Sequence, residues 1–83
     1  MLTGLQIRAA RAIVRMEQSA LADAAGVSLP TIKRLERFDG PISANTSTET
    51  ALRKALEAAG VIFIDENGHG PGVRLRKNDN SER

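Results

Sequence analysis

Apolar residues recur every three or four positions through most of this chain, the spacing that places them on one face of an α-helix. Glycine, proline or polar segments separate four such stretches. They predict helices over about residues 4–15, 18–25 and 29–37, and from Ser47 or Thr48 to Gly60. The pattern therefore predicts a mainly α-helical domain.

Two of the predicted helices begin with a capping box. Thr3 with Gln6, and Thr46 with Glu49, have the spacing at which each side chain bonds the other residue's backbone N–H. The predicted apolar stripe of the first helix consists of Leu5, Ala9, Ala12, Ile13 and Met16, widened by Ile7, Ala10 and Val14. Its polar side carries Arg8, Arg11 and Arg15.

The periodicity changes after Gly60. Val61–Ile64 is β-branched and aromatic, residues 73–76 alternate apolar and basic side chains, and a glycine-rich loop lies between them. These segments predict a C-terminal β-hairpin over residues 61–76. Residues 77–83 are polar and charged, and are expected to be a disordered tail.

The first strand of this hairpin has four consecutive apolar residues, a pattern that indicates burial on both faces. Either Ile62 and Ile64 or Val61 and Phe63 form its core-facing side. The hairpin is expected to pack on the helices or to pair with a partner, because an isolated two-stranded hairpin is only marginally stable in water.

Residues 18–37 predict two short helices joined by a tight turn. Gly26 stands where the first helix ends and a left-handed backbone is needed, and Ser28 can cap the second helix. The expected inward-facing residues are Leu21, Ala22, Ala25, Ile32 and Leu35. A small residue at the crossing, a turn glycine and a β-branched plug are typical of a helix-turn-helix. We therefore predict such a domain over residues 3–60.

The composition argues against several kinds of site. The 83 residues include no Cys, so neither disulfides nor thiolate metal ligands are present. His69 is the only histidine and has no visible Ser or Asp partnership. We expect no enzyme activity, no metal and no cofactor. A cytoplasmic protein is expected, because the sequence contains no membrane-length apolar run and no secretory signal pattern.

The helix-turn-helix segment resembles the Xre/Cro-type family, which is named for phage repressors. The resemblance is carried by Gln18-Ser19-Ala20-Leu21-Ala22, Ala25-Gly26-Val27-Ser28 and Thr31-Ile32-Lys33-Arg34-Leu35-Glu36. It covers residues 3–60, and residues 58–76 are similar to a small bacterial variant with an added strand pair. The resemblance implies a lambda-repressor-like bundle of four or five helices and, commonly, DNA binding as a dimer.

In this family the third helix lies in the major groove. The resemblance implies a binding surface made of Gln18, Ser28, Leu29, Pro30, Thr31, Lys33, Arg34 and Arg37. Arg34 is the expected base reader, because a guanidinium can hold O6 and N7 of guanine together. Lys33, Arg37 and Gln18 are expected to meet phosphates. The net charge is only +2, so DNA binding would depend on this local charge.

Three residues depart from the family pattern. Leu29 and Pro30 stand where related repressors often carry polar base readers, and Glu17 stands where Ser or Thr often precedes the glutamine. Neither of the first two side chains forms hydrogen bonds, and a carboxylate at position 17 would repel a phosphate. Arg11 and Glu36 occupy positions that form an ion pair in related repressors, which would join the first helix to the third.

The primary hypothesis is transcriptional regulation by sequence-specific binding to an operator DNA as a homodimer. The alternative uses Leu29, Pro30 and Phe38 as an exposed apolar spot with a basic rim, which suits a protein partner. Some small proteins of this fold are antiactivators that sequester a transcriptional activator, for example one that controls transfer of an integrative and conjugative element. An antitoxin is the third hypothesis.

Overall fold

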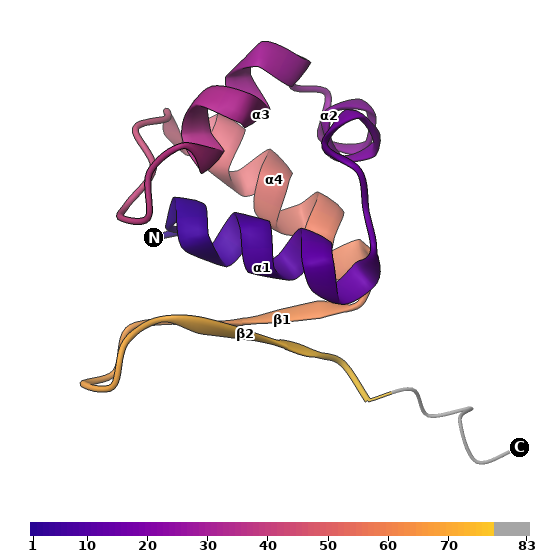
Figure 1. The fold of residues 1–83 in the computed structure, drawn as a ribbon. Coiled ribbons are helices and arrows are strands. Elements are labelled where there is room, and N and C mark those ends of the chain that lie inside the picture. Colours follow the sequence, from indigo (N-terminus) through magenta and orange to yellow (C-terminus); the bar gives the residue numbers. More distant parts are fainter. Residues whose placement is uncertain (78–83) are drawn as a thin grey trace, which may run out of the picture.

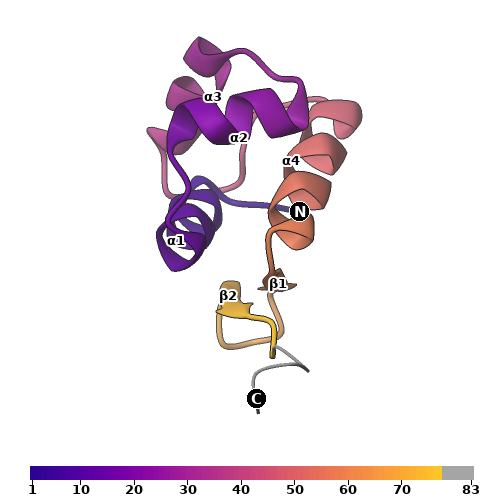
Figure 2. The same cartoon turned by 90° about the vertical axis from the view of Figure 1, so that its right-hand side faces the viewer.

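The computed structural model describes residues 1–77. The elements in this range are α1 (Gly4–Val14), α2 (Gln18–Ala25), α3 (Leu29–Glu36), α4 (Thr46–Ala58), β1 (Val61–Ile64) and β2 (Gly72–Leu75). The helices cluster together, and the hairpin runs along one side of the cluster (Figure 1). Turned by 90°, the molecule has β2 beside α1 and β1 below α4 (Figure 2). The fold is mainly α with one small antiparallel sheet, as predicted, and residues 78–83 of the predicted tail lie outside the described residues.

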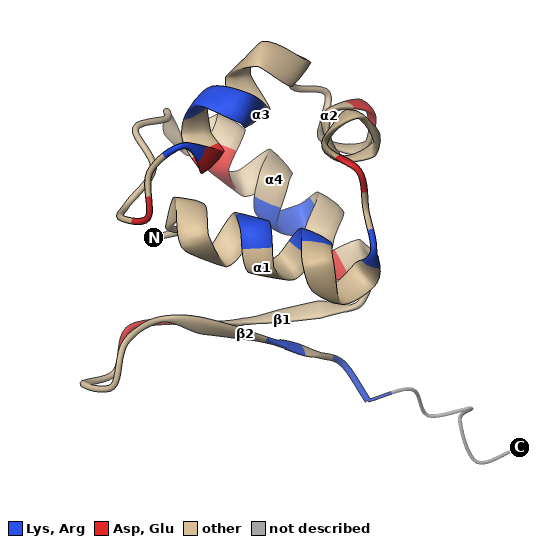
Figure 3. Cartoon of the chain, in the orientation of Figure 1, with Lys and Arg blue, Asp and Glu red and all other residues tan. Residues whose placement is uncertain are grey.

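The core lies between the helices and the inner face of the hairpin. Its buried apolar residues are Leu2, Ile7, Ala10, Leu21, Ala22, Ile32, Leu35, Leu52, Leu56 and Val61. Charged residues occur in every helix and along β2 (Figure 3). Among the described residues, only Gln6 and Glu36 are polar and buried. Both are hydrogen-bonded to other parts of the chain, and both turn out to hold elements together.

The predicted apolar face of α1 is buried only in part. Ile7 and Ala10 enter the core, whereas 53% of Leu5 and 36% of Ile13 remain exposed. Two neighbouring apolar stripes run along this helix, and hydrophobicity alone does not rank them. Gly4 allows its side of the helix to lie directly against the end of α3, because it has no side chain.

The predicted caps of α1 and α3 are formed. Thr3 Oγ1 accepts the N–H of Gln6 at 3.0 Å, and Gln6 Oε1 accepts the N–H of Thr3 at 2.9 Å. Ser28 Oγ accepts the N–H of Thr31 at 3.3 Å. Local side-chain spacing was sufficient to predict these caps, because every partner lies within three residues.

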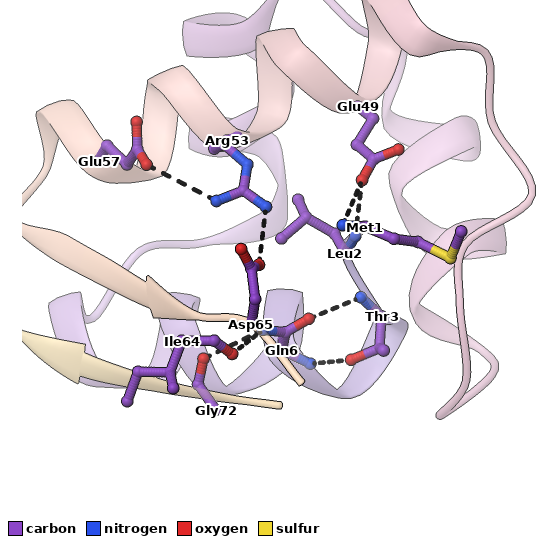
Figure 4. Close-up of polar contacts among 10 residues, drawn as sticks. All are labelled: Met1, Leu2, Thr3, Gln6, Glu49, Arg53, Glu57, Ile64, Asp65 and Gly72. Carbon is purple, nitrogen blue, oxygen red and sulfur yellow. Dashed lines mark hydrogen bonds and ion pairs between the residues drawn. The ribbon is translucent and has the colours of Figure 1, made fainter. Parts of the chain in front are cut away.

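The predicted capping box of α4 is wrong. The helix begins at Thr46, and Asn45 caps it by accepting the N–H of Thr48 at 2.8 Å. The Glu49 carboxylate instead accepts the N–H of Leu2 at 2.6 Å (Figure 4). The Glu49 side chain, which local spacing predicted to cap the helix, is therefore bonded to a residue far away in the chain.

The hairpin has an antiparallel register in which Val61 lies opposite Leu75 and Phe63 opposite Val73. Val61 is buried, Phe63 is half-buried, and 38% of Ile62 is exposed. Of the two alternatives left open by the sequence, the structure therefore has Val61 and Phe63 toward the helices. The second strand begins one residue earlier than predicted, at Gly72.

Gln6 joins the start of α1 to the hairpin. Its side-chain Nε2 donates to the carbonyl oxygens of Ile64 at 3.2 Å and Gly72 at 3.0 Å (Figure 4). These two residues face each other across the strands. The same side chain completes the capping box through its oxygen. One buried amide therefore holds the end of the hairpin against the first helix.

We predict that Gln6→Glu weakens hairpin docking while it keeps the cap. The introduced carboxylate still accepts the N–H of Thr3 but cannot donate to the two carbonyls, so the free energy of unfolding should fall by about 1–3 kcal/mol at neutral pH. Urea unfolding measures this loss. The deficit against the wild type should shrink in acid, because a protonated carboxyl regains a donor. An equal deficit at both pH values would contradict the assignment.

Gly4 lies against the backbone at the end of α3. Its N–H donates to the carbonyl of Gly40 at 2.9 Å. A Cβ at this position would collide with the carbonyl of Phe38 and lie 2.7 Å from the carbonyl oxygen of Leu35. The two backbones approach so closely only because Gly4 has no side chain.

We predict that Gly4→Ala lowers the free energy of unfolding by about 3 kcal/mol, because backbone atoms must move to admit the methyl group. Gly40→Ala is the matched control, since a Cβ there meets no atom within 4 Å. Chemical denaturation of both variants makes the comparison. Similar stability in the two variants would show that α1 and α3 separate easily.

Candidate nucleic-acid interface

A short turn places α3 against α2. Gly26 has a φ of +68°, and the N–H of Val27 closes the turn on the carbonyl of Ala22 at 3.0 Å. Ser28 then begins α3. In Figure 1, α2 and α3 lie at the end of the molecule that is opposite the hairpin. The outer side of α3 therefore faces away from the rest of the chain.

One face of α3 is exposed and basic. At about 100° per residue, Pro30, Lys33, Arg34 and Arg37 fall on the same side of the helix axis. All four are exposed. The opposite side carries Ile32, Leu35 and Glu36, which are buried. We call the four exposed residues the α3 face.

The basic residues of the α3 face are not neutralised within the described chain. No carboxylate of residues 1–77 forms an ion pair with Lys33, Arg34 or Arg37. Arg34 makes only one long hydrogen bond, from Nη1 to the carbonyl of Ser43 at 3.5 Å. Figure 3 shows α3, with its blue segment, at the end of the molecule that is opposite the hairpin. This face has the charge and exposure that phosphate contacts require.

The other predicted binding residues lie elsewhere. Ser28 and Thr31 bond each other through their hydroxyls at 2.8 Å as part of the helix cap. Leu29 is half-buried and packs against the core, so it does not project freely. Gln18 donates its side-chain N–H to Glu36 at 3.1 Å. Of the eight predicted residues, the structure gathers four on one face and directs these others toward neighbouring protein atoms.

A buried ion pair joins α1 to α3. Arg11 donates from Nε to Glu36 Oε2 at 2.6 Å and from Nη2 to Oε1 at 2.7 Å. The Glu36 side chain is only 4% exposed, and the third donor of Arg11 reaches the carbonyl of Met16 at 3.0 Å. The hydrogen-bonded Glu36 carboxylate raises the pKa of Arg11, burial lowers it, and the charges of Glu36 and Glu17 raise it further.

Arg8 adds a clamp that has no local sequence signal. Its guanidinium donates to the backbone carbonyl of Glu36 and forms an ion pair with Asp39. These contacts tie the middle of α1 to the residues that follow α3. Arg8 is distant in the chain from both partners, and a charged residue on the polar side of a helix ordinarily predicts only solvent exposure. Arg8 is therefore a structural residue and not a free cation.

No protein-family model and no curated protein matches this chain. None of the helices in residues 1–77 combines the length and apolar character that crossing a membrane requires. The same residues contain no group of three or more His, Cys, Asp or Glu side chains that could hold a metal ion. The α3 face is the part of the described surface where solvent-exposed cations gather on a single helix.

We predict that Arg11→Met lowers the free energy of unfolding by about 3–5 kcal/mol, because it leaves a buried carboxylate without its cation. The double variant Arg11→Met with Glu36→Met should recover most of this loss, since no buried charge then remains. Urea unfolding of both single variants and the double variant completes the cycle.

Lys54→Met is the control, because Lys54 is exposed and forms no ion pair with residues 1–77. It should change stability by less than about 0.5 kcal/mol. If the double variant is as unstable as the Arg11 variant, the loss of stability does not come from the unpaired Glu36 carboxylate.

Proposed function

We propose that this protein regulates transcription by binding DNA through a helix-turn-helix formed by α2 and α3. The observation that carries the proposal is the α3 face, with three exposed cations that have no carboxylate partner in residues 1–77. An α-helix with its side chains is about 10–12 Å wide, and the major groove is about 12 Å wide. The size and charge of this helix therefore suit the groove.

The α3 face suggests a division of roles. Arg34 is the proposed base reader, because its guanidinium is exposed in the last turn of the helix and matches guanine O6 and N7. Lys33 and Arg37 are the proposed phosphate contacts. Pro30 lies at the end of the helix that would enter the groove first, where its ring can touch a thymine methyl group but cannot form a hydrogen bond.

The buried ion pair supports this role indirectly. Glu36 is the acidic residue of α3, and its carboxylate is turned inward and neutralised by Arg11. The exposed side of the helix therefore presents no acidic group to a phosphate. Because the pair is bidentate, it also restricts the rotation of α3 about its axis, which sets the direction in which Arg34 projects.

We extend the proposal to a homodimer that binds two half-sites. A single helix with three cations covers only a few base pairs, and a second copy would double both the phosphate contacts and the base contacts. Two copies related by a two-fold axis would bind an operator with the same symmetry.

The protein-binding alternative on α3 has weaker support. Its apolar spot requires Leu29 and Phe38 together. Leu29 is half-buried against the core, and Phe38, which is 62% exposed, follows the opposite end of the helix. The eight residues of α3, about 12 Å of helix, separate the position of Leu29 from the segment that carries Phe38. We therefore favour DNA over a protein as the ligand of this face.

We predict that Arg34→Ala weakens binding to duplex DNA from the region upstream of the protein's own gene by about 1–3 kcal/mol and relaxes preference at one base position. Lys33→Ala should lower the affinity by a similar amount for every DNA sequence. It should also reduce the slope of log affinity against log salt by about 0.9, since one phosphate contact is lost. Fluorescence anisotropy at several salt concentrations measures both quantities.

Arg74→Ala is the matched control, because Arg74 is an exposed arginine on β2, at the other end of the molecule. Its loss should leave DNA affinity nearly unchanged. Equal losses in the Arg74 and Arg34 variants would indicate unspecific charge attraction. An unchanged affinity in the Arg34 variant would remove α3 as the reading helix.

A further inference from the structure

An apolar stripe of α1 lies outside the core. Leu5, Ala9 and Ile13 are four residues apart and therefore share one side of the helix. Leu5 is 53% exposed, Ile13 is 36% exposed, and Ala9 is half-buried. The stripe follows the side of α1 that adjoins the hairpin, since Leu5 and Ala9 line a hollow together with Val73 of β2.

The strand beside this stripe has an unpaired edge. The N–H of Arg76 donates to the carbonyl of Gly60 at 2.6 Å, which makes these residues a hydrogen-bonded pair. Hydrogen-bonded and non-bonded pairs alternate in an antiparallel ladder. With this register, Val73 and Leu75 direct their N–H and C=O groups away from β1. No backbone or side-chain group among residues 1–77 bonds them there.

The first half of the stripe and the start of β2 line one groove, through Leu5, Ala9 and Val73. α1 runs along the hairpin and contacts both strands (Figure 1), and in Figure 2 it lies nearer to β2 than to β1. The hollow between them, near the hairpin loop, has a volume of about 660 Å³. Its apolar lining consists of Met1, Leu5, Ala9, Pro41, Pro71 and Val73. An extended segment beside β2 would direct every second side chain into this groove.

The hollow near the hairpin loop has Asp39 and Glu66 in its lining, whereas the charged residues farther along β2 and just after it are basic. Arg74, Arg76 and Lys77 are exposed, and none forms an ion pair with a carboxylate of residues 1–77. Arg74 lies on the outer face of the hairpin, opposite Ile62 in the register. A strand that added to β2 would therefore have apolar side chains toward α1 and its alternate side chains beside Arg74. Opposite charge at those alternate positions stabilises neighbouring strands.

We propose that the edge of β2 and the stripe of α1 bind an extended segment of another protein in which large apolar and acidic residues alternate. The segment adds as a third strand, with backbone hydrogen bonds to Val73 and Leu75 and carboxylates beside Arg74. The site lies at the end of the molecule opposite α3, so it is a second interaction surface beyond the proposed DNA binding.

Two other occupants fit the groove less well. Residues 78–83 of the same chain contain no apolar side chain, so they have nothing to bury against Leu5 and Ile13. A second copy paired through the same edge would bring Arg74 and Arg76 of one strand close to those of the other. Like charges on neighbouring strands are destabilising. An acidic partner segment avoids this repulsion.

The test uses the full chain and a blocked peptide of about seven residues that alternates Ile and Glu. In a titration followed by NMR, the amides of Val73 and Leu75 and the methyl groups of Leu5 and Ile13 should shift saturably. The two amides should also gain protection from hydrogen exchange. A peptide with Lys in place of Glu, and one with the same residues grouped instead of alternating, should bind at least about tenfold more weakly.

Two variants separate the backbone and charge contributions. Leu75→Pro removes an outward N–H and leaves the bonds to β1, and Arg74→Glu reverses the charge on the outer face of the hairpin. Each should weaken peptide binding about tenfold. If the proline variant fails to fold, Leu5→Glu takes its place, because it puts a charge into the groove from α1. Lys54→Glu is the matched charge reversal on α4 and should bind the peptide like the wild type.

Several results would overturn the proposal. These are the absence of a saturable shift, shifts confined to α3, or equal binding by the Arg74 and Lys54 variants. Shifts at Val73 and Leu75 that grow with protein concentration alone would assign the groove to a second copy instead. DNA affinity is measured on the same variants, and a loss of peptide binding with retained DNA binding separates this site from the α3 face.

Discussion

The carboxylate of Glu36 imposes the constraint on which the helical part of this protein depends. A buried carboxylate is tolerated only with a cation and hydrogen bonds at close range. Arg11 supplies both with two short hydrogen bonds, and Gln18 adds a third. These partners come from α1 and α2, so the single group on α3 holds three helices at defined distances. The exposed side of α3 then carries only Pro30 and basic residues.

The first helix connects the two surfaces of the molecule. Toward α3 it presents Gly4, Arg8 and Arg11, which allow a close backbone approach and satisfy the charges there. Toward the hairpin it presents Gln6, whose amide bonds both strands. With these contacts in place, the second apolar stripe of the helix remains outside the core, and its Leu5 and Ala9 line a hollow beside β2. A basic face and an apolar groove consequently occupy opposite ends of one small domain.

Much of the candidate site could be predicted from the sequence, but not how its residues are used. The α3 face follows from helical periodicity, since Ile32 and Leu35 must turn inward and Lys33, Arg34 and Arg37 then turn outward. Leu29 could not be judged in the same way. Its exposure depends on how closely neighbouring elements pack beside it, and the structure leaves it half-buried.

The sequence by itself determined the features whose partners are close along the chain: the helices, the Thr3 and Ser28 caps, the Gly26 turn and the presence of the hairpin. Only the tertiary structure decided which stripe of α1 is buried, which face of β1 points inward and which N–H group donates to the Glu49 carboxylate. The physical reason is the range of the interactions. Caps and periodicity act within a few residues, whereas the rotation of a helix depends on contacts between segments that meet only after the chain has folded.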